Sequence, residues 1–368
     1  DGGTGGTDAD AVGLFLVALI GVLVALCLGA VCVATTGLSL RVPGMGLHRT
    51  PLFTWSSILA AALWLLTLPV LAGLLLLTYV DVRYGPTFLS GAEQSSEGTL
   101  FRIAWAWSQP SVYVYAIPAL GIIADVVPVA ARTRLTLHRV AMGCIGAFAV
   151  FSFGAWAMPG FAPDGGTPPL DYADEIPFLA FSFLVLLPLL AFTGLLADTL
   201  RRGAPRLISP LAWCLAALLM LLAGAANGAL VSIWGLELIE TTAATAQIHY
   251  VLVAVLLAAF GGVAFWAPRL WARALPEGPS TGLAVLGLLG CVLLCLPDLI
   301  SGLLDQLARF GGVADDESTV EALNTASVAG GALLVLVAIG FVALVVTAAA
   351  GRRGAVADDD PWGGHTLE

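Results

Sequence analysis

Long apolar stretches alternate along the chain with short segments rich in glycine, proline and charge. An α-helix crosses the hydrocarbon core of a bilayer with about 20 apolar residues. Backbone polar groups in hydrocarbon must be hydrogen-bonded within their own segment, so each stretch is expected to be helical. The pattern therefore predicts an all-α polytopic membrane protein with about nine spans, at roughly residues 10–36, 52–80, 109–131, 140–160, 177–199, 207–235, 245–267, 280–303 and 327–350.

Charge alternates from one connection to the next. One set of connections carries twelve of the fifteen arginines, whereas the other set carries mainly aspartate and glutamate. Arginine-rich connections face the cytoplasm by the positive-inside rule. The N-terminal end is then outside and the C-terminal end cytoplasmic, which requires an odd number of spans and agrees with nine. The twelve arginines are Arg41, Arg49, Arg132, Arg134, Arg139, Arg201, Arg202, Arg206, Arg269, Arg273, Arg352 and Arg353.

The composition excludes an ordinary soluble domain. Hydrophobic residues make up 59% of the chain and charged residues 11%, and the mean hydropathy is +0.96. Soluble globular proteins carry about 25% charged residues. The six cysteines include no CxxC motif; Cys291 and Cys295 share a helical face and are interpreted as core residues, because buried cysteine behaves as a small hydrophobe.

Residues 1–350 are expected to form a single transmembrane bundle domain, and residues 351–368 a cytoplasmic tail. The chain begins DGGTGGTDADA, without a methionine or the basic leader of a signal peptide. This beginning favours a processed or trimmed piece of something longer.

Several stretches resemble subunit I of the haem-copper cytochrome c oxidases. The resemblance implies a subunit I-like helical bundle of the aerobic respiratory chain. Order and spacing agree with the family's helices four to twelve, whereas helices one to three have no counterpart. The matching stretches are LSLRVPGMGLHRTPLFTW (38–55), WAWSQPSVYVYAIPALGII (105–123), QIHYVL (247–252) and DDPWGGHTLE (359–368). The first is similar to the family's loop between helices four and five, and the last to a bacterial ending.

The resemblance also implies which residues the oxygen-reducing centre would need. The family holds a copper with three histidines and a high-spin haem with a fourth, since imidazole suits both metals. This chain has four histidines, and only His249 lies in a predicted span; His48, His138 and His365 lie in a loop, at a helix start and in the tail.

The family's ligand positions carry other residues in this sequence. The histidine and glutamate of the family's HPEVY motif align with Gln109 and Ser111, whereas the tyrosine that crosslinks to that histidine is kept as Tyr113. The high-spin haem ligand aligns with Gln247, and the consecutive histidines of the seventh helix fall at or beside Ala155 and Trp156. The resemblance thus implies that copper and the high-spin haem are absent, with no catalytic residue and no metal ligand in the chain.

Positions that serve proton transfer and magnesium binding in the family are also altered. The lysine and threonine of a proton pathway align with Phe192 and Leu189, and the magnesium-binding His-Asp pair reads Ile239-Glu240. In the family, two consecutive arginines contact the haem propionates. The corresponding stretch of this sequence, around Arg309, has no clear match to that pair.

Ionisable groups within spans are candidates for function. Asp125 lies near Arg132 and Arg134, so a snorkelling or ion-paired acid is favoured over a proton carrier. Asp298 follows Pro297 near the outer end of its span and is expected to be hydrated.

Asp198 stands three and four residues before Arg201 and Arg202. Side chains at this spacing are neighbours on a helix, so pairing at the membrane boundary is predicted.

His249 has two interpretations. Residues two apart on a helix point roughly 200° apart, so His249 faces away from Gln247. One interpretation is a neutral histidine hydrogen-bonded across the bundle. The other is an axial ligand of a low-spin haem, a role that the resemblance gives this position; its second ligand would come from another chain or an upstream segment.

The favoured hypothesis is a subunit I-like membrane protein that does not reduce oxygen by itself and serves as a structural or assembly subunit. The alternative is a haem-binding electron-transfer subunit that uses His249; an active terminal oxidase or a transporter ranks below both. The expected partners are the lipid bilayer and other respiratory membrane subunits, or a chain that supplies the missing helices, and not nucleic acid. The expected location is a bacterial or archaeal cell membrane.

Overall fold

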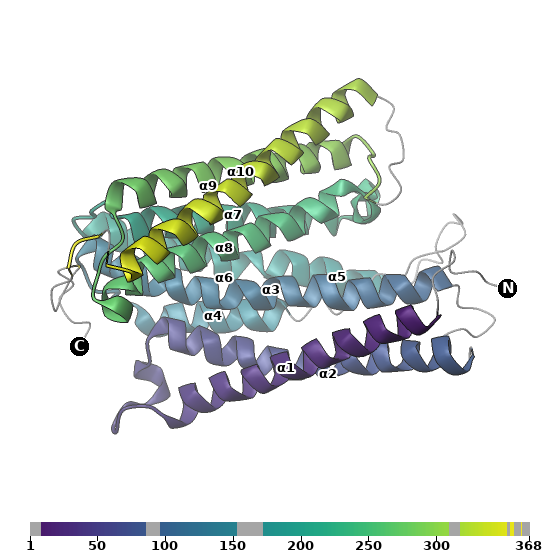
Figure 1. Cartoon of the computed structure of the whole chain (residues 1–368), viewed down its shortest axis with the longest axis horizontal. Coiled ribbons are helices and arrows are strands. Elements are labelled where there is room, and N and C mark those ends of the chain that lie inside the picture. Colours follow the sequence, from purple (N-terminus) through teal and green to yellow (C-terminus); the bar gives the residue numbers. More distant parts are fainter. Residues whose placement is uncertain are drawn as a thin grey trace.

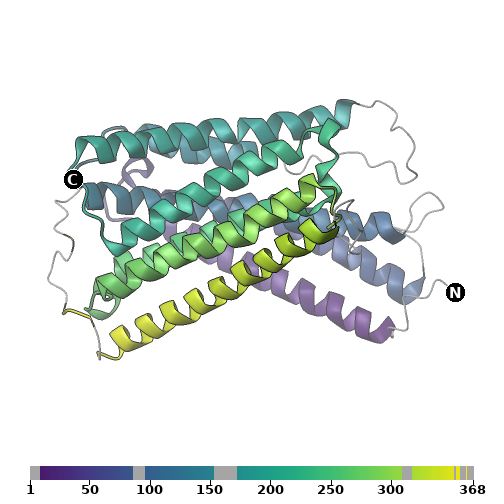
Figure 2. The same cartoon turned by 90° about the horizontal axis from the view of Figure 1, so that it is seen from above.

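The computed structural model describes residues 9–85, 96–152, 172–308, 317–351, 354–356 and 362. Across these ranges the regular structure is helical, with two isolated β-bridges near helix ends. The long helices run side by side (Figures 1 and 2). They are α1 (Ala9–Ser39), α2 (Leu52–Tyr84), α3 (Ser96–Ala131), α4 (His138–Ser152), α5 (Tyr172–Leu184), α6 (Leu186–Arg202), α7 (Ser209–Val231), α8 (Thr242–Trp271), α9 (Glu277–Leu303) and α10 (Glu317–Ala349).

The predicted all-α membrane architecture is confirmed. Eight helical segments within the described ranges are long and apolar enough to cross a membrane. They correspond to eight of the nine predicted spans, and α3 begins well before the predicted start at residue 109. The remaining span, predicted at 140–160, is described only as far as Ser152, so nine spans remain a prediction.

The predicted span 177–199 lies in one apolar helical segment, Ile176–Arg202. Val185 separates α5 from α6 within it, although its backbone dihedrals stay helical. Pro188 lies four residues after Leu184. Proline lacks the N–H that would bond the carbonyl four residues earlier, and its ring crowds that carbonyl. The proline therefore accounts for the break, which lies beside the candidate site described below.

One large core joins helices α2 to α4 and α6 to α10, and Trp213, Phe148 and Phe192 are fully buried in it. The outermost helix, α1, packs on α2 through a separate cluster of leucines. Much of α1 is exposed, for example Leu14, Phe15 and Leu28. Figure 1 shows the α1–α2 pair and the α9–α10 pair on opposite sides of the bundle, with α3, α6 and α8 between them.

Asp125 joins two helices through backbone hydrogen bonds. Its Oδ1 accepts from the N–H of Leu52 at 3.1 Å and its Oδ2 from the N–H of Phe53 at 3.2 Å. The first N–H groups of a helix have no partner within the helix, and Pro51, which precedes α2, provides no side-chain cap. The expectation of a snorkelling or arginine-paired acid was therefore wrong, because Asp125 caps α2 from α3.

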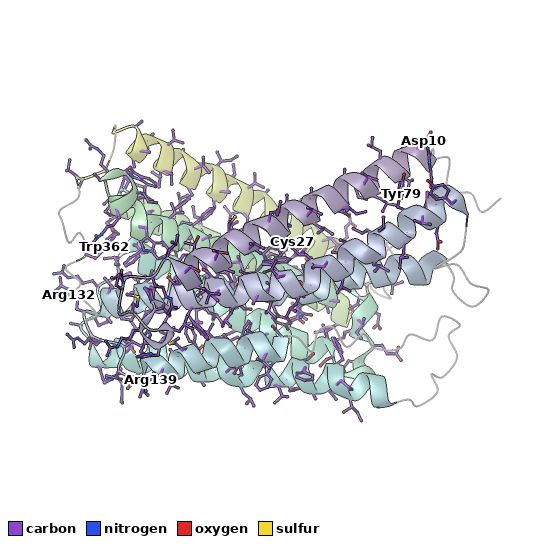
Figure 3. All side chains as sticks on the ribbon, turned by 90° about the horizontal axis from the view of Figure 1, so that it is seen from below. Asp10, Cys27, Tyr79, Arg132, Arg139 and Trp362 are labelled. Atoms are coloured by element: carbon purple, nitrogen blue, oxygen red, sulfur yellow. The ribbon has the colours of Figure 1, made fainter. Side chains whose placement is uncertain are left out.

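Arginines gather at one end of the bundle. Arg132 and Arg139 lie at the same end as Trp362, opposite Asp10 (Figure 3). At the end of α6, the predicted pairs are confirmed: Asp198 lies 3.5 Å from Arg201 and 2.8 Å from Arg202. This distribution agrees with the charge alternation from which the cytoplasmic side was predicted.

The described part of the tail is held against α8. Trp362 Nε1 donates to the Phe265 carbonyl at 3.0 Å, and the two rings stack with centroids 6.2 Å apart. Arg273 donates to the Gly354 carbonyl at 3.1 Å. These contacts fix the start of the tail and Trp362 to the end of the bundle.

We predict that Asp125→Ala lowers the free energy of unfolding by about 2 kcal/mol, because two N–H groups at the start of α2 lose their acceptor. The measurement is the unfolding midpoint of the purified protein in detergent. Asp198→Ala is the matched control, since it removes only the two ion pairs to Arg201 and Arg202 at the end of α6, and exposed pairs are worth about 0–1 kcal/mol each. Equal losses in the two variants would contradict the capping role.

Candidate functional site

The candidate site lies on the first half of α8, where two polar side chains face different directions. Thr241 caps this helix, since its Oγ1 accepts from the N–H of Ala243 at 3.3 Å. Gln247 is buried, with 4% of its surface exposed. His249 is more accessible, with 37% of its side chain exposed. The prediction that the two residues face different sides is confirmed.

Gln247 is engaged by a residue of α3. Its Nε2 donates to the Tyr113 hydroxyl at 3.0 Å, and Tyr113 is 5% exposed. The Phe148 ring of α4 packs edge-on against Tyr113 with centroids 5.9 Å apart. The amide and the phenol therefore satisfy one another in a buried, aromatic setting, as buried polar groups require.

Gly228 on α7 leaves the space that this pair occupies. A Cβ built at Gly228 would lie 2.6 Å from Gln247 Nε2 and 2.7 Å from the Tyr113 hydroxyl. Both distances are shorter than the van der Waals separation between a carbon atom and a nitrogen or oxygen atom. The close approach of α7 therefore requires glycine here, and the Gln247–Tyr113 hydrogen bond depends on it.

A small hollow adjoins the Gln247–Tyr113 pair near the break between α5 and α6. It has room for about one water molecule. Hydroxyls from Ser152 and Ser182 share its wall with the pair. The full lining is Tyr113, Phe151, Ser152, Phe178, Phe181, Ser182, Val185 and Gln247.

On the other side of α8, His249 meets an acid of α9. Its Nδ1 lies 3.1 Å from Asp298 Oδ2. The Asp298 side chain is only 13% exposed. The expectation of a hydrated Asp298 was therefore wrong, because the carboxylate is largely covered and hydrogen-bonded to His249. The interpretation of His249 as hydrogen-bonded across the bundle is confirmed, and the contact engages Nδ1 of its ring.

Residues that would hold a copper do not come together in the part of the chain that the structure describes. Among those residues, no three His, Cys, Asp or Glu side chains are grouped as metal ligands. His48 lies in a short 3-10 helix (Leu47–Arg49) and His138 begins α4. The side chains of Gln109, Ser111 and Glu240, and the residues Ala155, Trp156, Arg309 and His365, lie outside the described part.

The positions of the altered proton pathway are apolar and closed. Phe192 and Leu189 are each 1% exposed and belong to the main core. The cysteine pair is also buried, with Cys291 Sγ and Cys295 Sγ 3.8 Å apart. These residues fill space between helices and present no polar group to a ligand.

Comparison with known proteins identifies the family. Residues 2–333 match the family described as cytochrome C and quinol oxidase polypeptide I. The chain belongs to this family. Similar relatives include a putative cytochrome c oxidase subunit 1-beta of Streptomyces avermitilis, 31% identical over 93% of this chain and 60% of the relative. Cytochrome c oxidase subunit 1 of Thermostichus vulcanus is 27% identical over 98% of this chain and 64% of the relative.

The chain spans roughly 60% of the length of these relatives. Membership confirms the resemblance to subunit I, the integral membrane location and the connection with the respiratory chain. The family binds haem and copper. At the position that the resemblance aligns with the high-spin haem ligand, the chain carries Gln247, whose amide is hydrogen-bonded to Tyr113. An amide engaged in this way does not offer the imidazole that such a haem would need.

Two partners in this site were missed from the sequence. Asp298 is 49 residues from His249 and Gly228 is 19 residues before Gln247, and neither spacing has a local signature. The sequence did offer one signal for the His249–Asp298 contact. An acid and a histidine in neighbouring apolar spans each carry a free-energy cost in the membrane, and such groups usually pair with one another.

We predict that Gly228→Ala destabilises the bundle by roughly 1–3 kcal/mol, because the added methyl overlaps the Gln247–Tyr113 pair. Thermal unfolding in detergent measures the loss. Gly143→Ala in α4 is the matched control: its Cβ meets nothing within 4 Å, and alanine is there favoured by up to about 1 kcal/mol. The destabilisation caused by Gly228→Ala should be smaller in a Tyr113→Phe background, because that change removes one of the two overlapping atoms. An equal destabilisation there would contradict the proposed overlap with the Gln247–Tyr113 pair.

Proposed function

We propose that this protein is a member of the subunit I family that does not reduce oxygen by itself and acts as a structural or assembly subunit of a respiratory membrane complex. The observation that carries the proposal is the hydrogen bond between Gln247 and Tyr113. It closes the side of α8 on which the family's oxygen-binding haem would be ligated. A carboxamide is also a poor ligand for iron, whereas imidazole is a common one.

The loss of proton-carrying residues supports the same proposal. Reduction of oxygen needs protons as well as electrons, and Phe192 and Leu189 provide neither donor nor acceptor at the positions aligned with a proton pathway. Both are packed in the core. The fold is kept around these substitutions, which is what a role in association requires.

The outward surface of the bundle supports an association with further helices. His249 shares an exposed stripe of α8 with Leu252 and Leu256, which are 40% and 37% exposed. A polar side chain that faces lipid is costly in the span of a membrane protein. We propose that helices from another chain, or from an upstream segment, cover this stripe in a bacterial or archaeal cell membrane.

The experiment is purification of the tagged protein from its native membranes under mild detergent. We expect respiratory oxidase subunits to co-purify, and the protein separated from them to consume no oxygen with reduced cytochrome c. A stable monomer without such subunits would argue against the structural role. Oxygen consumption by the isolated protein would overturn the proposal that it is not catalytic.

A second candidate function is electron transfer through a low-spin haem ligated by His249. Two observations favour it. The imidazole is partly exposed on the outward stripe, and its Nδ1 is engaged by a carboxylate. Metal-bound histidines commonly donate their other ring N–H to a carboxylate. The residues present on this side therefore fit the haem iron, which would supply a one-electron redox centre when bound.

We predict for this candidate that the purified complex shows a Soret band that His249→Ala abolishes. Gln247→Ala is the matched control, because it changes the opposite face of the same helix and leaves His249 in place. The measurement is the optical spectrum with haem quantified per protein. A wild-type protein without haem would exclude the candidate, and a band that survives His249→Ala would assign the ligand elsewhere.

A further inference from the structure

We propose that Asp298 is a positioning residue for His249: it accepts a hydrogen bond from Nδ1–H and so directs the bare Nε2 toward the outward stripe as a ligand for iron. The proposal rests on the second candidate function. It differs from that candidate because it assigns a separate task to a residue of α9 that does not touch the iron.

The position of Asp298 relative to α8 is fixed by neighbouring contacts. Thr242 Oγ1 donates to the Asp298 carbonyl at 2.9 Å, and Thr242 N–H donates to the Gln306 carbonyl at 2.9 Å. One turn further along α9, Gly302 approaches the start of α8 so closely that a Cβ on it would lie 2.2 Å from the Ala243 nitrogen. The backbone that carries Asp298 is therefore held firmly against the first turns of α8.

Exposure gives the pair a direction. The Asp298 side chain is 13% exposed and the His249 side chain 37% exposed, so the imidazole is the more accessible member of the pair. The two nitrogens of the imidazole flank Cε1, and their bonding directions diverge widely. With Nδ1 engaged at 3.1 Å by the carboxylate, Nε2 is the nitrogen left to bind iron.

The groups packed around the pair do not compete for its contact. Cys295 on α9 and Tyr250 on α8 are the ionisable side chains that interact electrostatically with Asp298. The thiol of Cys295 is engaged with Cys291. Among the described residues, His249 is the side chain to which the Asp298 carboxylate is hydrogen-bonded.

A carboxylate in this place has a chemical consequence. An imidazole whose N–H is held by a carboxylate is more basic at its other nitrogen and has one tautomer. A more basic ligand favours the more highly charged ferric iron over the ferrous iron. Asp298 is thus expected to tighten haem binding and to lower the midpoint potential of the iron that His249 holds.

The test compares Asp298→Asn, Asp298→Ala and the control Asp198→Asn, which changes an exposed acid away from the site. Removal of such a partner weakens metal binding by roughly 10- to 100-fold. We expect Asp298→Ala to weaken the affinity of the protein for haem by this factor. In Asp298→Asn, we expect haem to be kept, with a midpoint potential raised by about 59 mV for each tenfold loss of ferric over ferrous preference. Asp198→Asn should match the wild type in both measurements.

Nitrogen NMR of the histidine-labelled protein without haem provides a readout that does not need the cofactor. Wild-type His249 should show a protonated Nδ1 and a bare Nε2, and Asp298→Ala should lose this preference; His249→Ala assigns the signal.

The outcomes separate the two proposals. Absence of haem from the wild type overturns both the haem function and the positioning role. Haem that is bound with unchanged content and potential in Asp298→Ala overturns the positioning role alone. If the Asp298→Ala protein fails to fold, the Asp298→Asn variant and the NMR of the wild type test the proposal instead. A wild-type His249 protonated at Nε2 rather than Nδ1 would overturn it.

Discussion

The interior of a bilayer provides no water to which a polar group can hydrogen-bond, and most features of this protein follow from that constraint. It makes the backbone helical, since a helix satisfies its own N–H and C=O groups. It also acts on the few polar side chains that remain within the spans. Three of these side chains have a partner on another helix: Asp125 on the start of α2, Gln247 on Tyr113, and His249 on Asp298.

These three pairings have different meanings. Asp125 satisfies backbone groups and explains how α3 is fastened to α2. The Gln247–Tyr113 pair lies at the position that the resemblance aligns with a haem ligand, and it is the observation on which the proposed function rests. The His249–Asp298 pair leaves one ring nitrogen available on an accessible face, and therefore allows ligation. A hydrogen bond within the membrane can thus close a site or prepare one, according to which atom it leaves unoccupied.

The two sides of α8 therefore differ in this protein: one is closed by a buried hydrogen bond and the other carries a partly exposed histidine. A fold and its chemistry are separable, because the packing of helices and the ligation of metals depend on different residues. The buried face around Gln247 is tightly packed, as the close approach of Gly228 indicates. The outward face around His249 is not covered by the described helices, and its partly exposed histidine is the reason to expect a helical partner there.

The sequence by itself determined the fold class and the apolar stretches, and it predicted the sidedness. Hydropathy and arginine placement are summed over many residues, so no single contact decides them. It also determined that Gln247 and His249 face different ways, since helical periodicity is local. The Pro188 break was readable in principle from the sequence. Only the tertiary structure decided the partners of Asp125, Gln247 and His249. Each partner lies 49 or more residues away, and which residues meet across a bundle depends on the rotation and depth of each helix. Those are set by packing of all the helices together, as the close approach at Gly302 shows for α8 and α9.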